Sequence, residues 1–172
     1  GSMINFSLDH QSATLAHLNV RAELHGEDPQ PAADLKFSWS TSNSVLAEFA
    51  PDLKSALFRP PNPDEQQELL NDPAFLPHPK FPKLGGLSWS DEIVGATVTV
   101  HWGASGKGDV VLEQCTVDKF RFELVDGGSV FITIRVKCHP SEAQVGKLFS
   151  KLGCETELSI EPPAAEGLDK AA

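Results

Sequence analysis

The six histidines and three cysteines are the residues of this chain best suited to metal binding or nucleophilic chemistry. They are scattered, and none falls into an H-E-x-x-H or C-x-x-C spacing that would assemble a metal or redox site. Cys138 and His139 are adjacent, but neighbouring residues of a strand point to opposite faces. We therefore expect no catalytic residues, no metal site and no cofactor, and a protein that is not an enzyme.

Two loops carry further candidate chemistry. The stretch ELHGEDPQPAAD, residues 23–34, is rich in carboxylates that could hold a divalent cation, but it lacks the spacing of an EF-hand. The stretch GASGKG, residues 103–108, resembles a phosphate-binding loop, but no Ser or Thr follows Lys107 and a strand pattern comes next. We interpret the first as a solvated acidic loop and the second as a hairpin tip.

The charge balance narrows the choice of partner. The chain of 172 residues has a formal net charge of −10, which opposes a nucleic acid or an anionic membrane. No apolar run approaches the ~18 residues of a membrane span. The odd number of widely spaced cysteines and the lack of a secretory signal favour free, buried thiols in a reducing cytoplasm. We expect no direct nucleic acid binding, no membrane contact, and a protein partner with a basic surface.

The strongest structural signal lies between residues 115 and 153. Phe120, Phe122 and Leu124 alternate with charged residues, and residues 130–138 alternate in the same way around the turn Asp126-Gly127-Gly128, which predicts a hairpin. An amphipathic helix follows, which begins near Ser141 and ends at Gly153. Its predicted apolar face consists of Val145, Leu148, Phe149 and Leu152.

The N-terminal half repeats this order. Residues 16–24 and 35–39 alternate as strands, and Ser42 then offers an N-cap for short helical turns that extend to Leu57. The tetrapeptide that begins at Arg21 (RAEL) is similar to the one that begins at Arg121 (RFEL). This leaves two alternatives open: a pseudo-duplicated strand-strand-helix unit, or generic strand patterning.

These patterns predict an α+β, β-rich fold in which antiparallel sheet packs with two amphipathic helices. We expect a single β-rich domain over residues 3–161, with a Pro-rich internal connection at 59–83 and a flexible acidic tail at 162–172. Gly1 and Ser2 are typical of an expression-tag scar. Residues 155–160 are short and acidic, as a protected edge strand would be, and a homodimer that covers this edge is left open.

Four segments carry a resemblance that spans residue 3 to about residue 163: VRAELHGEDPQPAADLKFS, FPKLGGLSW, CTVDKFRFELVDGGSVFITIRVKCHPSE and ELSIEPP. Together they resemble a family of small, uncharacterised accessory proteins of tailed bacteriophages. The resemblance implies a viral protein in the cytoplasm of an infected bacterial host. There it would bind and inhibit a host factor or assist phage DNA metabolism. It supplies no catalytic or cofactor-binding residue.

We therefore expect a non-enzymatic phage accessory protein that modulates or inhibits a host protein, such as a defence or DNA-processing factor, through acidic loops. The alternatives are an accessory factor of phage recombination or replication that acts through a protein partner, and a cryptic enzyme. The six candidate partner-binding residues are Glu27, Asp28, Asp64, Glu65, Asp91 and Glu92. They share a place in segments predicted to be exposed, where carboxylates attract a basic surface. The alternative role for them is to keep the protein soluble.

Overall fold

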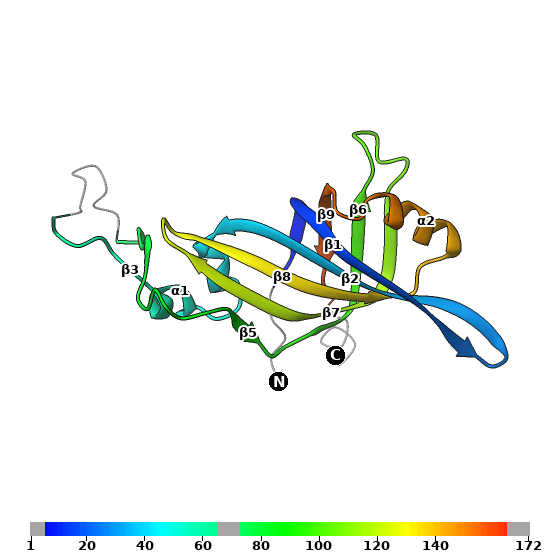
Figure 1. Ribbon diagram of the computed structural model, residues 1–172, viewed down its shortest axis with the longest axis horizontal. Coiled ribbons are helices and arrows are strands. Elements are labelled where there is room, and N and C mark those ends of the chain that lie inside the picture. Colours follow the sequence, from blue (N-terminus) through cyan, green and yellow to red (C-terminus); the bar gives the residue numbers. More distant parts are fainter. Residues whose placement is uncertain (1–5, 65–72, 165–172) are drawn as a thin grey trace, which may run out of the picture.

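The computed structural model describes residues 6–64 and 73–164, and its main element is a closed barrel of six antiparallel strands (Figure 1). The order around the barrel is β7-β6-β9-β1-β2-β8, and pairing of β8 with β7 closes it. The barrel strands are β1 (Leu8–His25), β2 (Asp28–Ser42), β6 (Ile93–His101), β7 (Val110–Val125), β8 (Ser129–Cys138) and β9 (Glu155–Glu161). The β-rich α+β prediction is confirmed, whereas closure of the sheet was not predicted.

Shorter elements surround the barrel. They are the 3₁₀ helix η1 (Asn43–Glu48), α1 (Leu53–Leu57), α2 (Glu142–Ser150), and the strands β3 (Phe58–Arg59), β4 (His78–Pro79) and β5 (Leu87–Trp89). Strand β5 pairs with the second half of β7, next to the stretch that pairs with β6. One edge of β7 thus meets two partners in succession, β6 and then β5.

The predicted hairpin is confirmed as β7 and β8. Gly127 and Gly128 have φ values of +105° and +93° at its turn, a conformation that glycine adopts at little cost. Alternate residues of β8 fill the barrel: Val130, Ile132, Ile134, Val136 and Cys138 are all buried. Period-two alternation therefore identified the inward face of this strand correctly.

Strand β7 departs from simple alternation at two bulges. Its buried apolar residues are Val110, Leu112, Cys115, Val117, Phe120 and Phe122, so two of the steps between them are three residues long. The extra residues are accommodated around Gln114 and Lys119, each with φ of 55°, where the pairing register shifts. A β-bulge is the device that inserts one residue and restores the inward alternation.

The helical predictions are confirmed in part. Helix α2 begins with a capping box between Ser141 and Gln144, and Gly153 has the expected positive φ of +79°. Of the predicted apolar face only Leu148 is fully buried, while Phe149 is 67% exposed. Ahead of it, the predicted short helical turns are confirmed as η1, which Ser42 caps, and α1, which follows Pro51; neither is long enough to be the second amphipathic helix that was expected.

The prediction that residues 155–160 form an edge strand is wrong. Strand β9 lies between β1 and β6 and pairs with both. Thr156, Leu158 and Ile160 are buried, whereas Glu155, Glu157 and Glu161 are exposed on the outer face. The outward-facing glutamates gave the segment the composition of an edge strand. Because β9 is paired on both sides, residues 155–160 offer no free edge for a homodimer to cover.

Strands β1 and β2 continue beyond the barrel as a two-stranded arm, at the right of Figure 1. The pairing of β1 with β2 extends to His25 and Asp28, whereas that of β2 with β8 ends at Ala33. Val20 and Leu24 are 44% and 74% exposed. The alternation of residues 16–24 thus predicted a strand correctly, although the outer part of this strand has no core to cover.

The ends of the Pro-rich connection are held together. Phe58 and Arg59 pair with Pro79 and His78, and the Lys80 amide donates a hydrogen bond to the Leu57 carbonyl at 2.8 Å. Residues 65–72 and the tail beyond residue 164 lie outside the described residues. The duplicated unit stays a prediction, although both hairpins, β1–β2 and β7–β8, are followed by helical segments.

Candidate functional site: a groove beside strand β7

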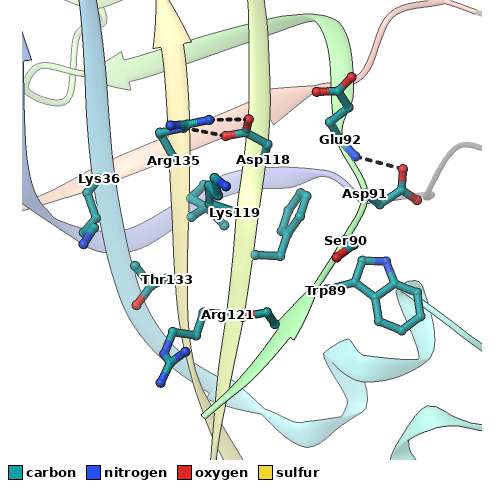
Figure 2. A pocket seen from close by; sticks show the side chains of 13 residues that line it. Lys36, Trp89, Ser90, Asp91, Glu92, Asp118, Lys119, Arg121, Thr133 and Arg135 are labelled. Atoms are coloured by element: carbon teal, nitrogen blue, oxygen red, sulfur yellow. Dashed lines mark hydrogen bonds and ion pairs between the residues drawn. The ribbon is translucent and has the colours of Figure 1, made fainter.

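A groove of about 790 Å³ lies on the outer face of the barrel, where β5 and residues 90–92 run beside β7 (Figure 2). Its polar and aromatic lining comes from four strands and one loop. The residues are Lys36, Ser88, Trp89, Ser90, Asp91, Glu92, Asp118, Lys119, Phe120, Arg121, Thr133 and Arg135. Clefts of ~300–1,000 Å³ that join apolar walls to a few polar groups are the usual form of a binding site.

The bulge at Lys119 shapes the floor of the groove. Val117 and Phe120 both face the core, although they are three residues apart. Their spacing leaves Asp118 and Lys119 together on the outer side of β7, and Lys119 is exposed there. The same local irregularity that completes the core therefore places two adjacent charged residues in the groove.

Asp118 and Arg135 form the central ion pair of the groove. Arg135 donates from Nε and Nη2 to the two carboxylate oxygens of Asp118, at 2.8 and 2.7 Å, and Lys137 Nζ lies 3.6 Å from the same carboxylate. Burial alone would raise the pKa of Asp118, but the hydrogen bonds and charge of Arg135, with the charge of Lys137, outweigh it and lower that pKa. This carboxylate is thus ionised and fully engaged.

Three further cations of the groove are not engaged in this way. Within the described part of the chain, Lys36, Lys119 and Arg121 make no ion pair and no side-chain hydrogen bond. The guanidinium of Arg121 lies against Gly86, where an added Cβ would overlap it. The absence of a side chain at Gly86 therefore leaves room for Arg121 beside the groove.

The other side of the groove is acidic and aromatic. Asp91 accepts a hydrogen bond from the Glu92 amide at 2.8 Å, and Figure 2 shows both carboxylates on the side opposite Lys36. Trp89 is half-buried, with its ring packed on Phe49 at a centroid distance of 5.9 Å. The groove thus presents cations on one side and carboxylates on the other, with an indole at its acidic edge.

The six predicted partner-binding residues do not gather on one surface. Asp91 and Glu92 line the groove, whereas Glu27 and Asp28 are exposed at the tip of the arm. The segment 60–64, which contains Asp64, lies at the opposite end of the molecule from that tip (Figure 1). Glu65 is outside the described residues. Sequence reasoning missed the cations: Arg121 and Arg135 lie on the predicted hairpin, but Lys36 joins them only through the pairing of β2 with β8, which has no local signal.

A second polar cluster joins Asp109, His101 and Ser159. His101 Nδ1 lies 2.9 Å from Asp109 Oδ2, and its Nε2 lies 2.7 Å from Ser159 Oγ. The order carboxylate, imidazole, hydroxyl is that of a hydrolase triad. The hydrogen bond from the Trp102 amide, followed by that from His101, lowers the pKa of Asp109.

The surroundings of Ser159 favour a structural role for this cluster. Ser159 is only 8% exposed, and its hydroxyl oxygen also accepts a hydrogen bond from the His10 amide at 2.9 Å. The His10 ring stacks on His101 with centroids 3.8 Å apart. The hydroxyl is thus engaged and covered, whereas a nucleophile must be open to its substrate. We interpret the cluster as a polar link between β1, β6 and β9.

The cysteines differ in their exposure. Cys115 and Cys138 are buried free thiols, as predicted, and burial raises the pKa of each to about 12. Cys154 is exposed, which the sequence analysis did not anticipate. It follows Gly153 in the turn between α2 and β9, outside the barrel.

Comparison of the chain with protein-family models, curated proteins and solved structures found no match. The resemblance to phage accessory proteins therefore stays an expectation. Among residues 6–64 and 73–164, no helix has the length and apolar character needed to cross a membrane. Function has to be inferred from the groove itself and from the distribution of charge.

Proposed function

We propose that this protein is a non-enzymatic binding protein whose groove beside β7 receives an extended segment of a protein partner. The observation that carries the proposal is the charge pattern of the groove: Lys36 and Arg121, which make no ion pair among the described residues, face the carboxylates of Asp91 and Glu92 across it, with Trp89 beside the carboxylates. Tryptophan and arginine are the residues most enriched among those that dominate the affinity of protein interfaces.

The arrangement of charge defines the kind of segment that fits. Asp91 and Glu92 favour a Lys or Arg side chain of the partner, and Lys36 and Arg121 favour a carboxylate farther along the same segment. Trp89 lies on the same side as the carboxylates and suits an apolar side chain at that end of the segment. The net charge of −10 disfavours nucleic acid as the direct ligand.

In the viral setting that the resemblance implies, the partner is a host or phage protein in the infected bacterial cytoplasm. A host defence or DNA-processing factor would be modulated or inhibited when its segment is held in the groove. A phage recombination or replication protein would instead be assisted. The two roles differ in the identity of the partner, and the groove chemistry is the same in both.

A pull-down from bacterial lysate tests the proposal. The bait is the full chain, with and without nuclease treatment of the lysate, at low and high salt. Three charge-reversal baits are compared with the unmodified chain: the groove variant D91K/E92K, the arm variant E27K/D28K, and the matched control E113K/E155K. Glu113 and Glu155 are exposed and do not line the groove, so the control makes the same change in net charge elsewhere.

The proposal predicts a partner that survives nuclease treatment, is retained by the E113K/E155K control, and is lost from the groove variant. Loss from all three reversals alike would show that net charge alone attracts the partner. Loss from the arm variant only would transfer the binding site to the tip at Glu27 and Asp28. Either result, or release of the partner by nuclease, contradicts a groove-bound protein segment.

A further inference from the structure

Three side chains with metal-ligating atoms meet on the arm that extends beyond the barrel. Glu23 and His25 come from β1, and His139 directly follows the end of β8. The Nε2 atom of His139 lies 3.1 Å from Oε1 of Glu23, and one ligand atom from each residue can be chosen so that all lie within 4.8 Å of one another. In the part of the chain that the structure describes, this is the one group of its kind.

The fold explains why these residues meet. Glu23 and His25 are two residues apart on a strand, so they share a face of the arm. Ala33, opposite Val20 in the pairing of β1 with β2, is also opposite Cys138 in the pairing of β2 with β8. This common register brings His139 to the base of the arm. Arg21, on the same face, holds the second oxygen of Glu23, with Nε 3.4 Å from Oε2.

We propose that Glu23, His25 and His139 bind one divalent transition-metal ion, with Zn²⁺ as the best-suited ion. Zinc binds imidazole nitrogen and carboxylate oxygen at ~2.0–2.2 Å, so ligand atoms around a tetrahedral ion are roughly 3.3 Å apart. The 3.1 Å separation of His139 and Glu23 already matches this. His25 is exposed, and its ring already stands edge-on to that of His139 with centroids 6.3 Å apart. Imidazole ligands select such ions over Mg²⁺ and Ca²⁺, which prefer oxygen.

The chemistry of the group supports the proposal. A carboxylate and two imidazoles form a donor set that zinc commonly uses in proteins. Three protein ligands leave a fourth tetrahedral position to water. The ion replaces the His139–Glu23 hydrogen bond and ties the arm to the junction of β8 and α2. This role is independent of the groove.

Calorimetric titration of the chelator-treated full chain with ZnCl₂ tests the site. The unmodified chain should bind one Zn²⁺, and excess Mg²⁺ should not displace it. The variants H25A, H139A and E23Q should each weaken binding at least tenfold, because loss of even an outer hydrogen bond to a ligand costs ~10–100-fold. H17A and C154S are the matched controls, since both residues are exposed and outside the group.

Hydrogen exchange gives a second readout that does not depend on heat of binding. Zn²⁺ should slow exchange of the arm amides at residues 20–25 in the unmodified chain and not in H139A. Circular dichroism of each variant verifies that it is folded. The proposal is overturned if no single-site binding occurs, if H25A and H139A bind normally, or if binding is lost instead in C154S or H10A.

Discussion

Asp118 and Arg135 stand directly opposite each other in the register of β7 and β8, and two hydrogen bonds join them at the floor of the groove. The pair lies just before the bulge at Lys119, where the two strands shift register. Because Asp118 already neutralises Arg135, it leaves Lys36, Lys119 and Arg121 available to a ligand. The pair thus has two effects: it joins β7 to β8 in the barrel, and it removes one positive and one negative charge from those that the groove offers to a ligand.

Asp118→Asn should destabilise the protein. The substitution removes the charge that compensates Arg135, and a hydrogen bond between charged groups contributes about 1.5–3 kcal/mol. We expect the free energy of unfolding in urea at pH 7 to fall by about that amount. Glu123→Gln, at an exposed carboxylate of the same strand, is the control and should change it by less than ~0.5 kcal/mol. Equal effects of the two variants would contradict a structural role for the pair.

The same pair predicts a pH dependence. The pKa of Asp118 is lower in the folded protein than its unfolded value of about 3.9. Its contribution is therefore fully present above the unfolded pKa and is lost as the pH falls through the folded pKa. The stability difference between the unmodified chain and D118N should hold from pH 7 to 5 and shrink in more acidic solution. A difference that stays constant into strong acid would show that proton binding at Asp118 is not responsible.

Leu148 and Phe149 form a matched pair on α2. Leu148 is fully buried and Phe149 is 67% exposed. Leu148→Ala should lower the free energy of unfolding by about 2–5 kcal/mol, the usual range for a buried leucine. Phe149→Ala should be nearly neutral in the same denaturation experiment. A neutral L148A would mean that α2 does not pack on the barrel.

Thiol reactivity should separate the cysteines. Cys154 is exposed, whereas Cys115 and Cys138 are buried and burial raises the pKa of each to about 12. A thiol reagent should modify one cysteine in the native protein and all three in denaturant. C154S should leave no fast-reacting thiol. Rapid native modification of two or more thiols would contradict the packing of the barrel interior.

The sequence predicted local structure well wherever one face of a strand is buried along its whole length. The β7–β8 hairpin and the cap of α2 followed from residues close together in the chain. The edge assignment of residues 155–160 failed because both partners of β9, the strands β1 and β6, are remote in sequence. For the same reason, the meeting of Glu23 with His139, and of Lys36 with Arg121, had no local pattern.

The bulges of β7 were open to prediction but were not predicted. The steps from Leu112 to Cys115 and from Val117 to Phe120 are three residues long, which breaks period-two alternation. When residues on both sides of such a step are apolar, an extra residue must be accommodated between them. Of the candidate site, the sequence identified only the acidic side, at Asp91 and Glu92.

Adjacent glycines allow the groove to be altered without a change of charge. The three atoms nearest to a methyl group at Gly86 all belong to the guanidinium of the flexible Arg121 side chain, whereas a methyl group at Gly85 meets nothing within 4 Å. Gly86→Ala should displace Arg121 and weaken partner binding, with less than ~0.5 kcal/mol change in unfolding free energy. Gly85→Ala should leave partner binding and stability unchanged. Equal affinity of the two variants for the partner would show that Arg121 is not part of the binding surface.

Hydrogen exchange of the partner complex tests the central claim most directly, because a bound segment slows exchange where it covers the backbone. The account predicts that the partner protects residues 88–92 and 117–121, on the two sides of the groove, and leaves the arm tip at 26–28 unchanged. Protection confined to the arm tip, or to residues 73–84 of the Pro-rich connection, would contradict the assignment of the groove as the binding site.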